Sequence, residues 1–222
     1  LNTIDGSNYV DAQRSQYVVP DKVIASVGYY IPFRHKGLLR GTHLNLFYSG
    51  YSSGGYSFCY TNDMNGDGIN NDLMYISEIN FKTEEDRVAF WKFVEQDSYL
   101  KNHKGQYAEA YSARAPWVHR FDFRLLEDFE FKIGKTKHCF QLSFDIMNVG
   151  NLINSKWGIS KTNTVSNSNR ILKYEGVKSA TDLTPVFSMY KVNGEYPTKT
   201  YDTYQNYSEC WKLQVGIRYV FN

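Results

Sequence analysis

The closing segment, residues 210–222 (CWKLQVGIRYVFN), decides the fold class because its side chains alternate in character along the chain. Every odd position from Trp211 to Phe221 is apolar, and the even positions between them are polar or glycine apart from Val220. Successive side chains of a β-strand point to opposite faces, so this pattern predicts a strand with one apolar face. The run is long enough to cross a membrane at a tilt, which takes roughly 9–11 residues, whereas soluble strands have about 5–6.

The same alternation recurs in four further stretches, so the sequence predicts five long strands. They cover residues 22–33, 41–49, 117–133, 137–149 and 209–221. The alternation in the third stretch has one fault, a place where it is reversed: Glu127 falls on the apolar side and Leu126 on the polar side. We attribute this fault to a β-bulge or to a position near the edge of a bilayer.

The connections between these strands alternate between short and long, and the long ones are residues 50–116 and 150–208. Short turns at one end and long loops at the other are typical of outer-membrane barrels, in which the short turns are periplasmic. The sequence therefore predicts an all-β chain whose five antiparallel strands belong to a large transmembrane β-barrel with two long extracellular loops. Because the smallest such barrels have eight strands, we expect further strands outside this sequence.

A soluble β-sandwich or up-and-down barrel also shows alternation. Three features argue against it here: the length of the strands, the charges on their polar side and the length of the two loops. Mean hydropathy is −0.51, and no apolar run approaches the roughly 18 residues of a spanning helix.

The composition excludes several functional classes. Lys and Arg number 25 against 23 Asp and Glu, which argues against nucleic acid as a partner. The three cysteines, Cys59, Cys139 and Cys210, are too widely spaced for a zinc site or a disulfide framework. The five histidines occur singly, outside the motifs of metalloproteases or serine hydrolases, so no enzymatic activity is predicted.

The first long loop contains one motif with a chemical meaning, residues 63–72 (DMNGDGINND). Its D-x-N-x-D-G pattern is the first half of a calcium loop, in which side-chain oxygens at positions 1, 3 and 5 and a backbone carbonyl at position 7 suit a hard cation. Position 12, where a bidentate acid belongs, is Met74. The alternative is an Asn/Asp/Gly turn that needs no metal. The candidate calcium ligands are Asp63, Asn65, Asp67, Ile69 (through its carbonyl), Asn71 and Asp72.

Both loops also contain predicted secondary structure. Thr83 followed by three acids predicts a capped helix that extends to about Tyr99 and packs in the first loop, with ligand or partner contact as the alternative. In the second loop, residues 170–174 and 185–192 resemble short strands, which we expect to form a hairpin extension.

Several stretches together resemble a known family. Residues 60–76 (YTNDMNGDGINNDLMYI), 90–105 (FWKFVEQDSYLKNHKG), 114–117 (RAPW), 145–149 (DIMNV) and 213–221 (LQVGIRYVF) are similar to the C-terminal region of TonB-dependent outer-membrane receptors. The similarity is closest to the Oar-like branch, which carries a carboxypeptidase-regulatory-like domain. One departure is that many such barrels end on Phe, whereas Asn222 follows Phe221 here.

The resemblance implies a 22-stranded barrel in the bacterial outer membrane, with its lumen filled by a plug domain that lies upstream of this sequence. It implies energised uptake of a scarce nutrient ligand, powered by the TonB complex through a TonB box that is also upstream. It further implies contact with outer-membrane lipid and recognition of the last strand by the barrel-assembly machinery. The alternative is a structural or adhesive outer-membrane protein whose long loops bind a partner.

Overall fold

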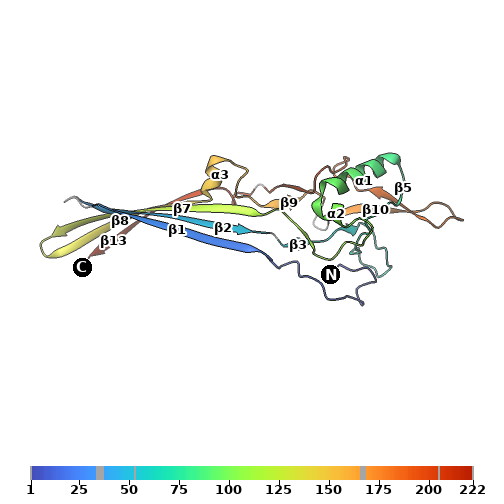
Figure 1. The fold of residues 1–222 in the computed structure, drawn as a ribbon, viewed down its shortest axis with the longest axis horizontal. Helices are drawn as coiled ribbons and strands as arrows, with labels where there is room; N and C mark the ends of the chain where they lie inside the picture. Colours follow the sequence, from blue (N-terminus) through green and yellow to red (C-terminus); the bar gives the residue numbers. More distant parts are fainter. Residues whose placement is uncertain (1, 34–37, 53, 166–168, 205, 222) are drawn as a thin grey trace. The chain divides into compact units, whose positions relative to one another are not determined.

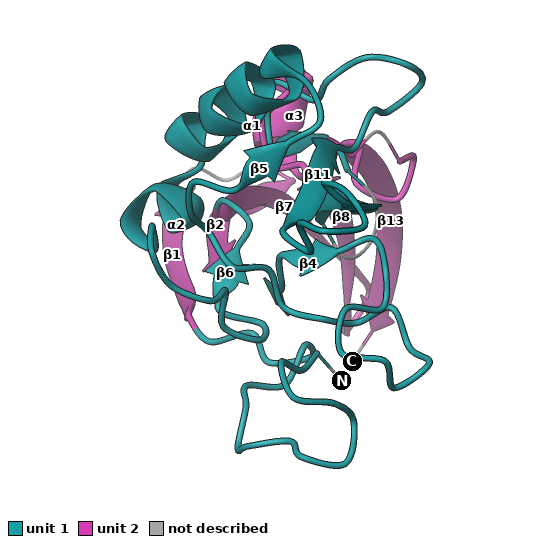
Figure 2. Cartoon of the chain, turned by 90° about the vertical axis from the view of Figure 1, so that its right-hand side faces the viewer, with its two compact units in different colours: residues 1–20, 53–116, 161–202 teal, residues 21–52, 117–160, 203–222 magenta. Residues whose placement is uncertain are grey.

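The computed structural model describes residues 2–33, 38–52, 54–165, 169–204 and 206–221. Of these residues, 45% lie in strands and 11% in three helices, and the main sheet is antiparallel, so the predicted mostly-β fold is confirmed. The chain divides into two compact units, which Figure 2 colours separately. Unit 1 comprises residues 1–20, 53–116 and 161–202, and unit 2 comprises residues 21–52, 117–160 and 203–222.

Unit 2 is a five-stranded sheet in which every neighbouring pair is antiparallel (Figure 1). Its strands follow the order β1-β2-β7-β8-β13, and each boundary lies within a few residues of the predicted one. The strands are β1 (Lys22–Pro32), β2 (Leu39–Tyr51), β7 (Val118–Ile133), β8 (Thr136–Met147) and β13 (Lys212–Phe221). A short helix, α3 (Val149–Ile153), follows β8.

The register of these strands extends the alternation from single strands to the whole sheet. Side chains paired directly across neighbouring strands share a face of the sheet. One row across all five strands is apolar: Tyr29, Leu44, Leu125, Phe144 and Val215. The adjacent row is polar or glycine: Gly28, Asn45, Arg124, Asp145 and Gln214. The sheet therefore has one apolar face and one polar face.

Glu127 interrupts the apolar face, and of the two explanations given for it, a bulge or a position near the bilayer edge, the bulge is wrong. β7 and β8 pair without a register shift from Phe123 to Ile133, and the shift between β2 and β7 lies between Leu39 and Gly41. Glu127 lies opposite Thr42, whose hydroxyl donates to both carboxylate oxygens at 2.8 and 2.9 Å. The polar exception is thus a cross-strand hydrogen-bonded pair within a regular ladder.

Unit 1 contains most of the two stretches predicted as loops, together with the first residues of the chain. A four-stranded sheet in the order β4-β10-β11-β5 lies beside two helices (Figure 1). The strands of this sheet are β4 (Cys59–Tyr60), β10 (Arg170–Val177), β11 (Pro185–Met189) and β5 (Asn80–Phe81). Two further pairs are separate from it: β3 (Gly55–Tyr56) pairs with β6 (Ala113–Arg114), and β9 (Lys161–Asn163) pairs with β12 (Tyr201–Thr203). The hairpin β10–β11 was predicted, whereas its parallel neighbours β4 and β5 were not.

A hydrophobic core of its own holds unit 1 together. Its fully buried side chains come from both long stretches and include Phe58, Met74, Ile76, Phe90, Phe93, Leu100, Ile171 and Leu172. Burying such a side chain contributes roughly 1.5–3 kcal/mol relative to leaving it exposed. Most of the two stretches predicted as loops, residues 53–116 and 161–202, therefore build a folded unit with secondary structure of its own.

The predicted helix is present but divided in two. α1 (Glu84–Gln96) begins after Thr83, whose hydroxyl accepts a hydrogen bond from the Asp86 N–H, and acids occupy its first turn. Asp97 then adopts an extended conformation and caps α2 (Ser98–Asn102), its carboxylate accepting from the N–H groups of Tyr99 and Leu100. A capping carboxylate satisfies the free N–H groups of a helix start, which explains why the predicted helix stops at Gln96.

Candidate functional site

The predicted calcium loop lies in unit 1 and folds onto its own backbone. The Asp63 carboxylate accepts hydrogen bonds from the N–H groups of Gly66 and Gly68, both at 2.7 Å. The Asn65 and Asp67 side chains likewise accept from backbone N–H groups two residues further on. Gly66 and Gly68 have φ values of 77° and 84°, a region that favours glycine. These are the hydrogen bonds of an Asx-type turn.

Asp72 approaches the start of the same loop. Its carboxylate accepts from the N–H groups of Met64 and Asn65. Burial raises the pKa of Asp72, the backbone hydrogen bonds oppose this rise, and repulsion from Asp63 and Asp67 adds to it. The charges of Asp63 and Asp67 therefore act on the Asp72 carboxylate.

Ser7 is a contact of the loop that sequence reasoning missed. Its N–H and hydroxyl donate to Asp67 at 2.8 and 2.7 Å, and these bonds hold the pKa of Asp67 below its usual value. Thr3 forms a bridge with Asp72 and donates its N–H to the carbonyl of Asn71. No local sequence signal links residues about sixty positions apart. These contacts of Ser7 with Asp67, called the Ser7 clasp below, are therefore visible only in the tertiary structure.

The Ile69 carbonyl and position 12 of the motif are less suited to a cation. The Ile69 carbonyl accepts from the Asn71 N–H, and Met74 at position 12 is fully buried in the core of unit 1. Among the described residues, no group of three or more His, Cys, Asp or Glu side chains could hold a metal ion. The oxygens of Asp63 and Asn65 are engaged by the loop itself and those of Asp67 by Ile69 and Ser7, so their present arrangement fits the turn better than the cation. Calcium binding stays a prediction.

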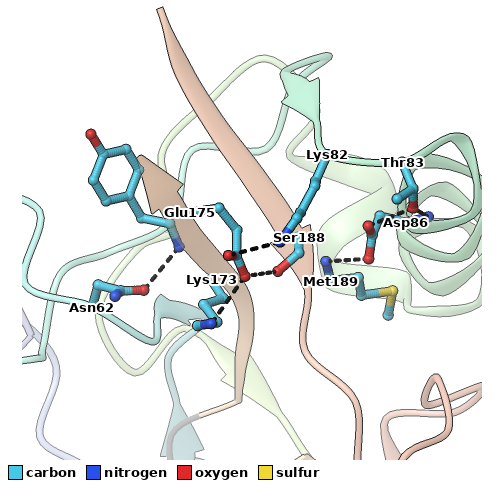
Figure 3. Close-up of polar contacts among 9 residues, drawn as sticks. Asn62, Lys82, Thr83, Asp86, Lys173, Glu175, Ser188 and Met189 are labelled. Atoms are coloured by element: carbon cyan, nitrogen blue, oxygen red, sulfur yellow. Dashed lines mark hydrogen bonds and ion pairs between the residues drawn. The ribbon is translucent and has the colours of Figure 1, made fainter. Parts of the chain in front are cut away.

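A second polar cluster in unit 1 surrounds Glu175 of β10 (Figure 3). Its carboxylate accepts from the Ser188 hydroxyl of β11 at 2.8 Å and forms ion pairs with Lys173 at 3.0 Å and Lys82 at 3.3 Å. The Ser188 hydrogen bond and then the two lysines lower the pKa of Glu175 to about 2. Lys173 and Glu175 are two residues apart on β10 and so share a face, but the strand predicted over residues 170–174 ended before Glu175.

This Glu175 cluster borders a hollow of about 580 Å³ between β5, the start of α1 and the β10–β11 hairpin. The charged residues that line it are Lys82, Glu84, Arg87, Glu175 and Lys178. Lys82 is paired with Glu175, and Arg87 is paired with Glu84 and Glu78. The hollow is therefore polar, with its positive and negative side chains largely matched.

Asp86 fastens the start of α1 to β11 beside this hollow (Figure 3). Thr83 donates its hydroxyl to one Asp86 oxygen at 2.6 Å, while the Met189 N–H donates to the other at 3.0 Å. The Tyr196 hydroxyl donates to that second oxygen at 3.0 Å. These bonds satisfy a buried carboxylate and join three chain segments, which is a structural role.

The polar face of the unit 2 sheet carries hydrogen-bonded charges. Arg124 pairs with Asp145 across β7 and β8, and Asp128 contacts both Gln141 and His43. A hollow of about 450 Å³ is lined in part by residues of this face, among them Asn45, Asp122, Arg124, Asp145 and Gln214. Buried unpaired charges are costly, so such a face suits contact with water or with another polar surface.

The apolar face presents large side chains at its surface, including Val27 at 70% exposure and Ile217 at 75%. Aromatic rings contact one another at both ends of this face. The short-turn belt, near the β7–β8 turn, comprises Phe131, His138, Phe140, Tyr219 and Phe221. The distal belt, at the opposite end of the strands, comprises Tyr48, Trp117, His119 and Phe121. Between the belts, aliphatic and phenyl side chains predominate.

No family model, curated protein or solved structure matches this chain. In the part of the chain that the structure describes, none of the helices has the length and apolar character needed to cross a membrane. The family resemblance, the absence of enzymatic activity and the predicted partners therefore stay predictions.

Proposed function

We propose that this chain is the C-terminal part of the barrel of a TonB-dependent receptor, which takes part in energised uptake of a scarce nutrient across the bacterial outer membrane. The observation that supports this proposal most strongly is the five-stranded sheet. It combines an apolar face, interrupted at the Thr42–Glu127 pair and bordered by two aromatic belts, with a polar face that carries ion pairs. This division matches the lipid-facing and lumen-facing surfaces of an outer-membrane barrel.

The height of the apolar face supports the same proposal. Phe121 of the distal belt and Phe131 of the short-turn belt are ten residues apart on β7. At roughly 3.3 Å per residue this is about 33 Å along the strand, and a tilt of about 40° reduces it to about 25 Å. An outer-membrane barrel presents an apolar band of about 25 Å.

The polar face fits the lumen of a wide barrel. A narrow barrel fills its interior with its own side chains, whereas a wide one encloses water or a plug. Arg124 forms an ion pair with Asp145, and Asp128 accepts a hydrogen bond from the Gln141 amide, so these charged groups have partners on the wall itself. In the proposed 22-stranded barrel, this wall faces the plug domain.

The connections give the proposal its orientation. The β7–β8 turn is short, whereas the segments that leave the opposite ends of β2 and β8 are long and contribute to unit 1. With the short turns in the periplasm, unit 1 lies outside the cell, where it would meet the nutrient ligand. The plug and the TonB box would supply the contact with the TonB complex, and β13 would be read by the barrel-assembly machinery.

The second candidate function is that of a structural or adhesive outer-membrane protein. The observation that favours it is the separate hydrophobic core of unit 1, because a rigid platform of this kind is suited to binding a partner. Adhesion needs no energy from the inner membrane, and this difference separates the two functions.

Growth on limiting nutrients tests the proposal. Strains of the producing bacterium that lack this protein, the TonB complex or both are compared across a panel of scarce nutrients. We expect the single deletion to impair growth on at least one nutrient, with no further loss in the double deletion. A protein that supports surface attachment equally well without the TonB complex, and whose loss leaves growth on every nutrient unchanged, would point to adhesion.

A further inference from the structure

A groove with an apolar lining runs along the outer face of α1 in unit 1. Val88 is 55% exposed at its centre, and the half-buried Ala89 lies beside it. Tyr196 and Pro197, from the segment that follows β11, also line the groove, whose volume is about 430 Å³. Figure 2 shows α1 at the margin of unit 1. The outer face of a helix is normally polar, so an apolar stripe beside a hollow indicates a contact surface.

The two sides of this groove are fastened to each other. The Tyr196 hydroxyl donates to the Asp86 carboxylate of α1 at 3.0 Å, and the same oxygen accepts from the Met189 N–H. The Lys191 ammonium lies 4.5 Å from the centre of the Tyr196 ring, in a cation–π contact. The groove therefore has a defined shape without a partner.

Charges of opposite sign stand at the two ends of the apolar stripe. Glu85 lies one turn before Val88 and Ala89, and Lys92 lies one turn after them, so all four share one face of α1. Both charged side chains are exposed, and in the part of the chain that the structure describes neither has an ion-pair partner. The neighbouring acids are already paired, Glu84 with Arg87 and Glu95 with Lys104.

The order of these side chains is self-complementary. The midpoint between Glu85 and Lys92 falls between Val88 and Ala89. When a second α1 packs antiparallel about a two-fold axis through this midpoint, each Glu85 meets a Lys92 of the other copy. At the centre, Val88 meets Ala89, whose small side chain lets the two helices approach closely. A parallel pair would instead place like charges opposite each other, which is unfavourable.

We propose that two copies of this chain associate through this groove, with their α1 helices antiparallel and the Glu85–Lys92 ion pair made twice. The occupant of each groove is thus the α1 helix of the second copy. α1 has 13 residues and is about 20 Å long, so the contact is at the small end of protein interfaces and association should be reversible. The pairing requires only the folded unit 1 and goes beyond the proposed function.

Charge reversal in the full-length protein tests this pairing. In a dimer of Glu85→Lys chains, two lysines face each other at both ends of the stripe, and in a dimer of Lys92→Glu chains two glutamates do. Lys101→Glu, at an exposed position of α2 outside the groove, is the matched control because it makes the same change of charge. Association is measured by sedimentation in detergent over a series of concentrations.

We expect each single reversal to weaken association by at least about tenfold, while Lys101→Glu leaves it unchanged. An equimolar mixture of Glu85→Lys and Lys92→Glu chains should associate as strongly as the wild type, because every lysine then faces a glutamate. This recovery also shows that both variants are folded. A wild type that stays monomeric throughout the series, reversals without effect, or a mixture no stronger than its components would each overturn the antiparallel pair.

Discussion

Glu127 is the residue at which the two-faced sheet is least regular. Its row on the apolar face consists otherwise of Ile31, Thr42, Leu142 and Ile217. The row lies between the two belts, so the proposed barrel places this carboxylate against lipid. The Thr42 hydroxyl supplies one hydrogen-bonding partner, which reduces the cost of that position but does not remove it.

Glu127→Leu should stabilise the protein in a bilayer by about 1 kcal/mol, because it removes a carboxylate from the apolar face. Denaturant unfolding from lipid vesicles measures the change. Glu130→Leu is the matched control, since Glu130 lies on the polar face and pairs with Arg40 at 2.8 Å. Stabilisation by Glu130→Leu that equals or exceeds the effect of Glu127→Leu would contradict the assignment of the faces.

Cys59 provides a second test at the scale of one residue. Burial raises the pKa of its thiol to about 12, and the side chain lies between Asn2 and the carbonyl of Asn71. Because the thiolate is the reactive form, Cys59 should remain unmodified by maleimide at pH 8 in the folded protein. The exposed Cys210 should react, and mass spectrometry distinguishes the two sites. Equal labelling of both thiols before denaturation would show that Cys59 is accessible, which would contradict its burial in unit 1.

At the scale of elements, the Glu175 cluster joins β10 to β11 and to Lys82. The pKa of the Glu175 carboxyl is lowered from 4.5 to about 2, so this carboxylate binds a proton less readily in the folded state than in the unfolded chain. The corresponding stability is therefore present above about pH 4.5 and is lost as the pH falls towards 2. Glu175→Gln should reduce the acid sensitivity of the β10–β11 hairpin, measured by hydrogen exchange between pH 5 and pH 2.5. An identical pH dependence in wild type and variant would remove Glu175 as its cause.

A separate prediction for unit 1 concerns the loop at residues 63–72. Asp63→Ala should lower the melting temperature with or without calcium, because the N–H groups of Gly66 and Gly68 lose their acceptor. Thermal unfolding in calcium and in chelator measures both effects, with Asp67→Ala as a second variant. A calcium-dependent rise in melting temperature that is confined to the wild type would establish the metal site, whereas equal responses in all three would establish the plain turn.

Over the whole molecule, the sequence was most informative where structure repeats at short range. The strands of unit 2 show a period of two over many residues, so their existence, faces and order along the chain could be predicted. The Glu127 fault was visible too, but its cause was not, because the Thr42 partner lies 85 residues away.

Most of unit 1 could not be predicted from the sequence, because its contacts also join residues far apart along the chain. Its strands β3, β4 and β5 are two residues long, too short to show a period. Its contacts, such as Met189 with Asp86 or Arg170 with the carbonyl of Asn70, join positions about one hundred residues apart. Capping at Thr83 is local and was predicted, while the Ser7 clasp and the Lys82–Glu175 pair depend on the tertiary fold.

In the proposed barrel, alternate side chains of the sheet meet hydrocarbon while their neighbours meet water. Leu125 and Leu126 test it most directly, since they are adjacent, chemically identical and on opposite faces near the middle of β7. Folding of Leu125→Arg and Leu126→Arg into lipid vesicles is measured by denaturant titration. We predict that Leu125→Arg costs about 2–4 kcal/mol and that Leu126→Arg costs less than about 1 kcal/mol. Equal costs, or a larger cost for Leu126→Arg, would contradict the claim.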